Sequence, residues 1–304
     1  MVTGANGMLG LALVEALQDV YQVIQIRHQS QAFDAVRGTG RSADEKIFEV
    51  DLSDPAECRN MIAIHKPDIV VHAAEYTDLD YCESMSSARW LNIESARMLA
   101  GALSLSGRFV YISSGQVFDG GRGPYREKDE RNPVNTYGAQ KVAAEDLVRT
   151  RKNSLIVRVP QLIGREPEDQ PGLLSSMMKA IDTRESGKLD DVCHHAPTWS
   201  VDVAEAVRFL LTRDAVGIFH AACPDGGTLY DLTQRLADFT GQSLAHKKPS
   251  SEIIKPCNGA RRPVNNQLLS QKLLELGFPG FHSFADTLVL LADQGLIPGE
   301  LAEH

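Results

Sequence analysis

The stretch MVTGANGMLG, residues 1–10, places glycines at positions 4, 7 and 10 directly after a short apolar segment. A turn from a strand into a helix presents free backbone N–H groups and the positive end of the helix dipole to an anion. Glycines let such a turn bend tightly and approach a pyrophosphate. The amphipathic segment LGLALVEAL (9–17) follows at once, and the apolar run VIQI (23–26) comes next. This context favours a dinucleotide-binding turn over a purely structural one.

The strand that should lead into this turn is short. Only Met1-Val2-Thr3 precede Gly4, whereas a strand usually has about five residues. Two explanations are open at this stage: the first strand is abbreviated, or the sequence begins part-way along it.

Apolar, β-rich segments alternate with helical patterns through the first half of the chain. Most of the expected strands have the composition of strands buried on both faces: VIQI (23–26), KIFEV (46–50), DIVVHAA (68–74), RFVYISS (108–114) and SLIVRVP (154–160). Helical spacing is found between them, in CRNMIAI (58–64) and in SARWLNIESARMLAGAL (87–103). The alternation predicts an α/β fold with a Rossmann-type doubly wound parallel sheet.

The pattern loosens from about Ile163. Helical pieces at 173–182, 201–212, 229–240, 270–276 and 283–294 mix with short strands such as GIFHAA (217–222). Residues 245–267 are rich in Lys, Ser, Pro and Asn and are expected to form a loop. We therefore predict a dinucleotide-binding domain over 1–162. A smaller C-terminal α/β substrate lobe would span 163–304, with some segments returning to the first domain.

The composition of the chain argues against some classes of binding partner. The 304 residues carry a net charge of −9, which argues against nucleic acid. No apolar run approaches the roughly 18 residues of a membrane span, and no N-terminal secretion signal is visible, so a cytoplasmic location away from membranes is expected. The five cysteines, at 58, 82, 193, 223 and 257, are odd in number and form no CxxC pair. We expect reduced thiols and no metal site.

The end of the second predicted strand bears on the choice of cofactor. NAD sites commonly place a carboxylate there, whereas NADP sites place an arginine. This chain reads QIRHQS (25–30), with Arg27 and His28 and no carboxylate before Asp34. We expect NADP(H) to be preferred over NAD(H); the alternative is that Arg27 is a solvated loop residue.

The stretch NPVNTYGAQKVAAEDL (132–147) carries the candidate chemistry. Asn132 suits a helix N-cap and Pro133 the first helical position. Tyr137 and Lys141 are four residues apart and therefore share one helix face. An ammonium near a phenol favours the phenolate, lowering a pKa that starts near about 10. Such a tyrosine can exchange a proton with a carbonyl or an alkoxide near neutral pH.

Ser114 closes the RFVYISS strand upstream, at the sheet edge where ligands bind. The glycine turn, Ser114, Tyr137 and Lys141, in this order and spacing, resemble an extended short-chain dehydrogenase/reductase. Six further stretches resemble its dTDP-4-dehydrorhamnose reductase branch, which also contains the regulatory β subunit of methionine adenosyltransferase: HAAEYTDLDYCES (72–84), SSGQVFDG (113–120), PYREKDERNPVNTYG (124–138), RVPQLIG (158–164), PTWSVDVAEAV (197–207) and ARRPVNNQLL (260–269). The match runs through nearly the whole chain.

The resemblance implies a role for each matching residue. Ser114 would hydrogen-bond the substrate oxygen, Tyr137 would donate the proton, and Lys141 would bind ribose hydroxyls and tune Tyr137. The implied cofactor contacts are Gly4, Asn6, Gly7, Met8, Leu9 and Gly10 at the pyrophosphate, Arg27 and His28 at the 2′-phosphate, Asp51 and Leu52 at adenine, Ala73, Ala74 and Tyr76 near the nicotinamide ribose, and Pro160 beside the nicotinamide. The implied substrate contacts are Gln116, Val117, Thr198, Trp199 and Arg262. Arg262 would clamp the nucleotide diphosphate; the alternative is a solvated basic turn.

Two positions depart from the branch. The reductases have an Asp-Tyr pair where this chain has Gly115-Gln116, which puts the identity of the substrate in doubt. Sugar-nucleotide dehydratases of the superfamily carry Asp-Glu there, so dehydration is disfavoured. Glu75 stands where a small residue is common; its carboxylate either repels an anionic ligand or faces solvent.

The implied activity is NADPH-dependent reduction of the C4 ketone of a nucleotide-linked 4-keto-6-deoxysugar, as in dTDP-rhamnose biosynthesis, with Tyr137 as general acid. One alternative is a non-enzymatic NADP-binding regulatory subunit like the methionine adenosyltransferase β subunit. The other is a reductase of an unrelated carbonyl. The short, acidic C-terminal segment GLIPGELAEH (295–304) slightly favours the enzyme. A homodimer is compatible with the resemblance.

Overall fold

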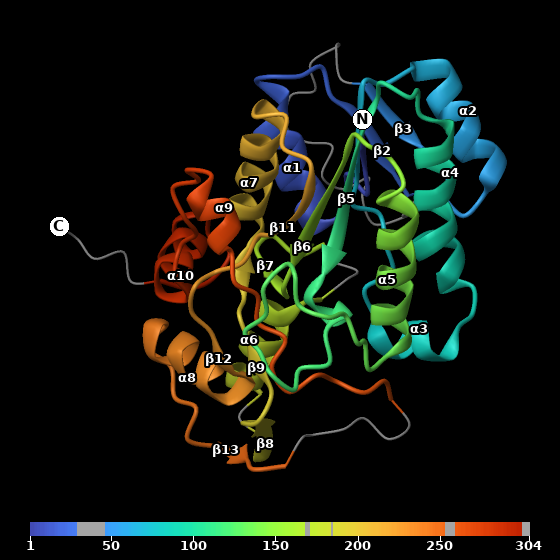
Figure 1. Ribbon diagram of the computed structural model, residues 1–304. Coiled ribbons are helices and arrows are strands. Elements are labelled where there is room, and N and C mark those ends of the chain that lie inside the picture. The colour runs from blue at the N-terminus through green and yellow to red at the C-terminus, as the bar shows by residue number, and fades with distance from the viewer. Residues whose placement is uncertain (29–45, 168–170, 184, 253–258, 300–304) are drawn as a thin grey trace.

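The computed structural model describes residues 1–28, 46–167, 171–183, 185–252 and 259–299. Its centre is a seven-stranded sheet in the order β11-β6-β5-β4-β1-β2-β3, in which neighbouring strands are parallel (Figure 1). The strands are β1 Val2–Thr3, β2 Ile24–Arg27, β3 Lys46–Glu49, β4 Ile69–His72, β5 Arg108–Ser114, β6 Ser154–Val159 and β11 Gly217–His220. The predicted Rossmann-type parallel sheet is confirmed.

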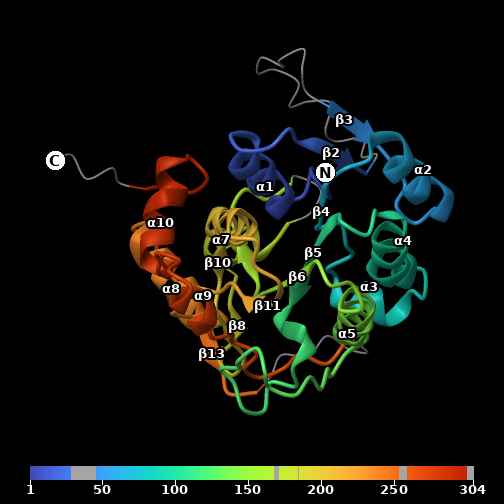
Figure 2. The ribbon, with the colours of Figure 1, turned by 45° about the horizontal axis from the view of Figure 1, so that its top comes forward.

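Helices cover both faces of the sheet, as Figures 1 and 2 show. On one face lie α1 (Met8–Gln18) and α7 (Ser200–Thr212), which pack against each other. The other face carries α2 (Pro55–His65), α4 (Ser95–Ala102) and α5 (Thr136–Val148). Successive residues of the central strands point to opposite faces, and each face has its own apolar core. This explains why these strands are apolar along their whole length.

The short strand β1 lies in the middle of the sheet, between β2 and β4. The hydroxyl of Thr3 lies 2.7 Å from Nδ1 of His72, and the hydroxyl of Ser95 lies 3.0 Å from Nε2 of the same ring. Because Ser95 donates its proton to the carbonyl of Leu91, it accepts from His72, and Thr3 donates to Nδ1. Burial, followed by the charge of Lys141, lowers the pKa of His72 to about 3, so the ring is neutral. This network joins β1 to β4 and to α4 beyond the backbone ladder.

A second group of elements packs around a separate apolar cluster, at the lower left of Figure 1. Its helices are α6 (Leu173–Asp182), α8 (Leu229–Phe239) and α10 (Phe284–Asp293). Three two-stranded pairs accompany them: β7 Leu162–Ile163 with β10 Thr198–Trp199, β9 His194–His195 with β12 Gly227–Thr228, and β8 Gly187–Asp190 with β13 Lys247–Ser250. In contrast, α7, β11 and the short α9 (Gln271–Glu275) pack at the main sheet, although they follow residue 163.

Two local predictions need correction. The segment 245–267 is not all loop, because β13 pairs with β8; its sequence KKPS has no apolar alternation that would predict a strand. The segment 87–103 is not one regular helix: a π-helical turn, η2 (Trp90–Glu94), leads into α4. Two further short elements complete the chain order, the helix α3 (Leu79–Ser84) and the 3₁₀ turn η3 (Gly115–Val117).

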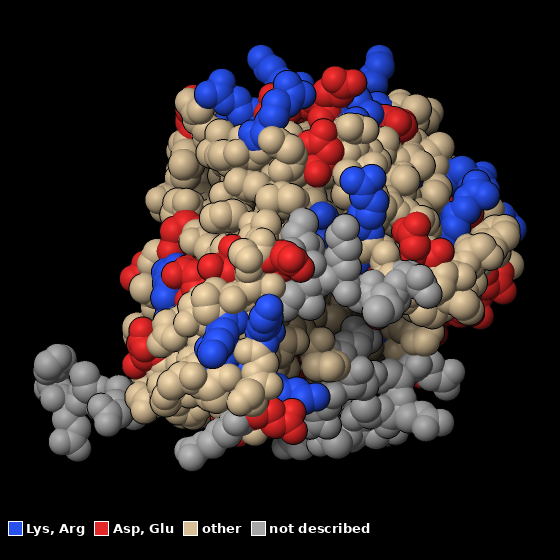
Figure 3. All heavy atoms as spheres, turned by 90° about the horizontal axis from the view of Figure 1, so that it is seen from below, with Lys and Arg blue, Asp and Glu red and all other residues tan. Residues whose placement is uncertain are grey.

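On the face shown in Figure 3, the basic and acidic side chains of the described residues are interspersed. No helix of the described residues is long and apolar enough to cross a membrane. Four cysteines, Cys58, Cys82, Cys193 and Cys223, are buried free thiols, and Cys257 lies outside the described residues. Within the same described ranges, no three His, Cys, Asp or Glu side chains gather as a metal site.

Candidate active site

The helix that carries the candidate chemistry, α5, begins three residues later than predicted. Its N-cap is Asn135, whose side-chain oxygen accepts a hydrogen bond of 2.8 Å from the backbone N–H of Gly138. Asn132 is instead hydrogen-bonded to the segment that follows β5, so the predicted cap at Asn132 and Pro133 is wrong. The helix start lies so close to this segment that a Cβ at Gly138 would be 2.2 Å from the carbonyl oxygen of Gln116.

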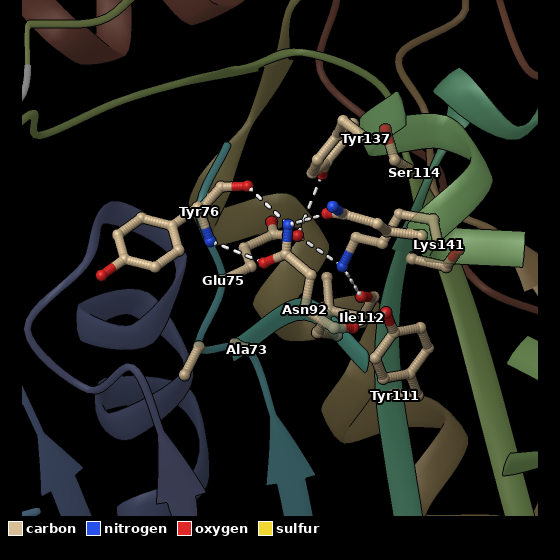
Figure 4. Close-up of polar contacts among 12 residues, drawn as sticks. Ala73, Glu75, Tyr76, Asn92, Tyr111, Ile112, Ser114, Tyr137 and Lys141 are labelled. Carbon is tan, nitrogen blue, oxygen red and sulfur yellow. Dashed lines mark hydrogen bonds and ion pairs between the residues drawn. The ribbon is translucent and has the colours of Figure 1, made fainter. Parts of the chain in front are cut away.

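Tyr137 and Lys141 lie on the buried face of α5 and Ser114 ends the adjacent strand β5 (Figure 4). Lys141 donates a 2.8 Å hydrogen bond to the carbonyl of Ile112, and its ammonium lies 4.6 Å from the ring centre of Tyr111. The same ammonium is 5.7 Å from the ring centre of Tyr137. The hydroxyl of Ser114 accepts a 3.2 Å hydrogen bond from the N–H of Gln116 and so caps η3. The structure thus brings the Tyr and Lys together on α5, with Ser114 on the neighbouring strand.

Glu75 joins this group from the loop after β4. One carboxylate oxygen, Oε2, accepts a 2.9 Å hydrogen bond from the Tyr137 hydroxyl and also forms an ion pair with Lys141 (Figure 4). Its side chain is 16% exposed, so of the two alternatives the one in which it simply faces solvent is wrong. The buried ammonium of Lys141 offers a carboxylate at this position a strong partner.

The protonation of the pair follows from these contacts. Burial raises the pKa of Tyr137 well above its usual range, and the Glu75 carboxylate raises it further, which outweighs the lowering by Lys141. Burial lowers the pKa of Lys141, but Glu75 and the phenols of Tyr111 and Tyr137 more than offset this, and the net change is upward. The lowered Tyr137 pKa expected from the sequence is therefore wrong for this arrangement. The site holds a protonated phenol beside an ammonium.

Asn92, in the π-helical turn η2, is a site residue that the sequence did not reveal. Its side-chain oxygen accepts a 2.8 Å hydrogen bond from the N–H of Tyr76, and its amide donates 3.1 Å to the carbonyl of the same residue. The amide also donates 2.7 Å to the side chain of Gln140 on α5. Asn92 therefore fastens the loop that contains Glu75 to the helix that contains Tyr137. The apolar residues around Asn92 have ordinary helical spacing in the sequence. A polar side chain at a helical position that faces the core was the one signal that could have pointed to Asn92.

The residues of the glycine turn fit a dinucleotide. Gly4 has φ +68°, and a Cβ there would lie 2.8 Å from the backbone nitrogen of Ala74. A Cβ at Gly10 would lie 1.9 Å from the carbonyl oxygen of Gly4, so the turn packs directly on the first turn of α1. Gly7 is the N-cap of α1, and no side chain of the described residues caps it. The first N–H groups of this helix are thus suited to a pyrophosphate.

Most of the other predicted cofactor residues lie in or after the carboxyl ends of parallel strands. Asn6 donates 3.3 Å to the carbonyl of His28, which ties the glycine turn to the end of β2. Arg27 is half-buried there and donates 2.6 Å to the side chain of Gln25. The remaining ones are Met8 and Leu9 in the first turn of α1, Asp51 and Leu52 after β3, Ala73, Ala74 and the exposed Tyr76 after β4, and buried Pro160 after β6.

Arg262 is held by a carboxylate in the structure. Its two terminal nitrogens donate to Asp80 of α3, at 3.0 and 2.9 Å, so it is not simply a solvated residue, and its predicted role at the nucleotide diphosphate stays a prediction. Asp80 also accepts a 2.7 Å hydrogen bond from the N–H of Ala260. The pair closes the segment around 260 onto α3, a contact between residues 182 positions apart.

The remaining predicted substrate residues are mostly engaged in the fold. Thr198 is fully buried; its hydroxyl donates to the carbonyl of Ala196 at 3.1 Å and accepts from the N–H of Cys223 at 2.8 Å. Trp199 and Val117 are buried as well, whereas Gln116 is half-buried and accepts from the side chain of Asn135.

Gly115 is covered by the C-terminal segment. A Cβ at this position would lie 2.9 Å from the carbonyl oxygen of Asn266. A carboxylate side chain at 115 therefore requires this segment to move. The absence of a side chain at Gly115 is therefore what allows Asn266 to lie this close.

A parallel doubly wound sheet, a glycine turn into α1 and a buried Tyr-Lys pair on α5 define the extended short-chain dehydrogenase/reductase class. Within this class the chain belongs to the family described as "RmlD substrate binding domain", whose model matches residues 1–295. The resemblance noted from the sequence is thereby confirmed.

Three similar proteins represent its relatives. Methionine adenosyltransferase 2 subunit beta of Bos taurus is 30% identical over 286 residues, covering 91% of this chain and 82% of that protein. A dTDP-4-dehydrorhamnose reductase of Clostridium acetobutylicum has a TM-score of 0.79 and 25% identity, covering 97% of this chain and 99% of that one. A dTDP-4-dehydrorhamnose reductase of Bacillus anthracis in complex with NADP has a TM-score of 0.79 and 23% identity, covering 96% and 98%.

Proposed function

We propose that the protein is an NADPH-dependent reductase of a nucleotide-linked 4-keto-6-deoxysugar. The observation that carries the proposal is the buried Tyr137–Lys141 pair on α5, beside the end of β5 where Ser114 lies. Membership of the RmlD family and similarity to a reductase of the dTDP-4-dehydrorhamnose class support the choice of substrate. The protein is accordingly an NAD(P)-dependent oxidoreductase.

In this proposal the residues of the site have the following roles. A reduced nicotinamide bound at the glycine turn would supply the hydride for the carbonyl carbon. Tyr137 gives its hydroxyl proton to the carbonyl oxygen, which is converted to the alcohol. Ser114 hydrogen-bonds the same oxygen and orients it. The Lys141 ammonium stabilises the tyrosinate that is left.

Cofactor binding would rest on the glycine turn and on the end of β2. Gly4 and Gly10 let the turn pack closely on Ala74 and on the first turn of α1, and Gly7 leaves the first N–H groups of α1 without a side-chain cap, where a pyrophosphate would bind. Arg27, at the end of β2, supplies a cation suited to a 2′-phosphate. This arrangement supports NADP(H) over NAD(H).

The direct test follows NADPH oxidation with purified protein and dTDP-4-dehydrorhamnose, with the reduced sugar nucleotide identified by mass spectrometry. Steady turnover supports the proposal. If NADPH binds tightly but neither this sugar nor other 4-keto sugar nucleotides are reduced, the assignment fails, and a reductase of an unrelated carbonyl becomes the next hypothesis.

A second function is favoured by one observation, the 30% identity with a methionine adenosyltransferase β subunit across 91% of the chain. We propose as the alternative a regulatory NADP-binding subunit, in which the same Tyr-Lys pair serves binding. Its test is co-elution of the protein with a methionine adenosyltransferase catalytic subunit in size-exclusion chromatography. A complex without turnover of any keto sugar would favour the alternative, and turnover without a complex would exclude it.

A further inference from the structure

One oxygen of Glu75 serves two partners of the proposed site. Oε2 accepts from the Tyr137 hydroxyl at 2.9 Å and pairs with the Lys141 ammonium. Tyr137 and Lys141 are 5% and 2% exposed, so water screens these contacts poorly. Glu75 is itself held in place, since the next residue, Tyr76, is bound through both its N–H and its carbonyl to Asn92.

Glu75 provides the negative charge nearest to the Tyr137 hydroxyl. The other ionisable side chains of the described elements packed around it are Lys141 on α5, Tyr111 on β5, His72 on β4, Tyr81, Cys82 and Glu83 on α3, and Glu145 further along α5. Burial raises the pKa of Tyr111 to about 12 and that of Cys82 to about 11, so both are neutral near pH 7, as is His72. Glu83 bonds the N–H of Thr136 at the start of α5, and Glu145 is paired with Arg158.

We propose that Glu75 is a positioning residue that keeps the Tyr137 hydroxyl protonated, so that the proton donor for carbonyl reduction persists to higher pH and alcohol oxidation requires a higher pH. This inference rests on the proposed function of the same site. It assigns a role to a residue at which this chain departs from the pattern of its branch.

The direction of the effect follows from the charges. In reduction the proton leaves Tyr137 for the carbonyl oxygen as the hydride joins the carbon, and solvent returns a proton to the tyrosinate afterwards. In oxidation the tyrosinate must already exist, because it accepts the proton of the alcohol. A carboxylate 2.9 Å from the phenol opposes the tyrosinate and therefore moves the second reaction to higher pH.

Removal of the charge should lower the pKa of Tyr137. Glu75→Gln keeps the size of the side chain and an acceptor for the hydroxyl but removes the charge next to it. An adjacent like charge changes a pKa by about 1–3 units, so the titration midpoint of Tyr137 should fall by that amount. The basic limb of the pH profile for reduction should move to lower pH by the same amount, and alcohol oxidation should become measurable at lower pH.

The first experiment titrates the protein without substrate, by NMR of chains labelled with carbon-13 at the tyrosine hydroxyl carbon. The Tyr137 resonance is assigned by its loss in Tyr137→Phe. The matched control is Glu83→Gln, which alters another carboxylate that contacts α5 and should leave the titration unchanged. If Glu75→Gln does not fold, Glu75→Ala replaces it, with the same expected shift. A Tyr137 resonance that titrates no earlier in the Glu75 variant than in the unaltered chain overturns the inference.

The second experiment records the pH profiles of reduction and oxidation for the unaltered chain and for Glu75→Gln. Parallel shifts of both profiles support the inference, whereas an equal loss of rate at every pH overturns it, since that is the signature of a merely structural residue. The two proposals fail in distinguishable ways. An earlier Tyr137 titration without any turnover supports the effect of Glu75 on the phenol and contradicts the reductase, and turnover with an unshifted titration contradicts only the role of Glu75.

Discussion

Helix α5 carries two buried ion pairs one turn apart, and they are built differently. Glu145 pairs with Arg158 of β6, and both side chains are almost fully buried, at 0% and 1% exposure. Lys141 pairs with Glu75 of the loop after β4, and Glu75 keeps 16% exposure. One pair joins α5 to strand β6 of the sheet, and the other lies among the residues of the proposed active site.

The Glu145 pair is saturated with hydrogen bonds. Arg158 donates to both carboxylate oxygens at 2.8 Å, Ser113 donates at 2.7 Å and Arg131 at 3.1 Å. Four donors from β5, β6 and the segment before α5 thus converge on one carboxylate. Such a pair fixes the helix against the sheet, and loss of one partner leaves a buried charge uncompensated.

The Glu75 pair relies on a single carboxylate oxygen that is shared between Lys141 and the Tyr137 hydroxyl. Its groups are the ones that the proposed chemistry uses, so they must be able to change partner. The difference teaches that burial of an ion pair does not by itself identify its role: the number and direction of its hydrogen bonds distinguish a structural pair from a functional one.

The largest effect should come from the hydroxyl at the site. Tyr137→Phe removes the proton donor, so the rate of carbonyl reduction should fall by about 10²- to 10⁴-fold. Stability should change by only about 1 kcal/mol, the contribution of one hydrogen bond. Stopped-flow single-turnover rates and urea unfolding of the same preparation check both parts. A variant that loses activity and unfolds together would contradict the contrast between the two pairs.

The structural pair should show the opposite behaviour. Glu145→Ala leaves Arg158 buried without its partner and should reduce the free energy of unfolding by about 3–5 kcal/mol. Urea denaturation measures this loss, and Glu205→Ala, which removes the partner of an exposed ion pair with Arg208, is the control. A loss below about 1 kcal/mol for Glu145→Ala would contradict the distinction between a structural and a functional ion pair on α5.

The same pair should dominate the response to acid. Burial raises the pKa of Glu145, but its bonds to Arg158, Ser113 and Arg131 more than offset this and hold the pKa below its usual range. A carboxyl group whose pKa is lowered by folding stabilises the fold above its unfolded pKa, and this contribution is lost as the pH falls through the folded pKa. Thermal unfolding of Glu145→Gln should therefore depend less on pH in acid than that of the unaltered chain. Equal acid dependence would contradict the assignment.

A smaller effect is expected at the proposed cofactor end of β2. Arg27→Ala should weaken NADPH binding by about tenfold or more, the loss expected for a hydrogen bond to a charged group, and should leave NADH binding nearly unchanged. Fluorescence titration with both cofactors gives the ratio of the two dissociation constants. An equal loss for both would show that Arg27 supports the fold of the strand end and does not contact a 2′-phosphate.

The smallest effect should come from the pair between α3 and the C-terminal segment. Asp80 and Arg262 keep 41% and 30% exposure, so solvent weakens their attraction. Asp80→Asn should cost about 0.2–1 kcal/mol of stability. Urea unfolding checks this value. A loss of several kcal/mol would show that this ion pair is structural, like the Glu145–Arg158 pair.

The sequence was sufficient for the features that depend on neighbours along the chain. The sheet was predictable because its central strands are apolar throughout, and Tyr137 and Lys141 were predictable because four residues span one helical turn. The helix start was misplaced because Asn132 and Asn135 are both suitable caps, and only the contact of Gly138 with the segment after β5 selects the second.

The partners of the charged residues could not be predicted. Glu75 and Tyr137 are 62 positions apart, and Asp80 and Arg262 are 182 positions apart, so folding alone brings them together. The role of Asn92 depends on a π-helical turn, which apolar spacing does not distinguish from an α-helix. The sequence does not reveal that Glu75 pairs with Lys141. For this reason it predicted a lowered pKa for Tyr137, whereas the structure raises it.

The most direct test of the proposed function uses NADPH deuterated at the transferring position together with dTDP-4-dehydrorhamnose. The account predicts deuterium at C4 of the sugar product with the unaltered chain, and almost none in the same time with Tyr137→Phe. Tight NADPH binding without deuterium in any product would contradict the reductase assignment.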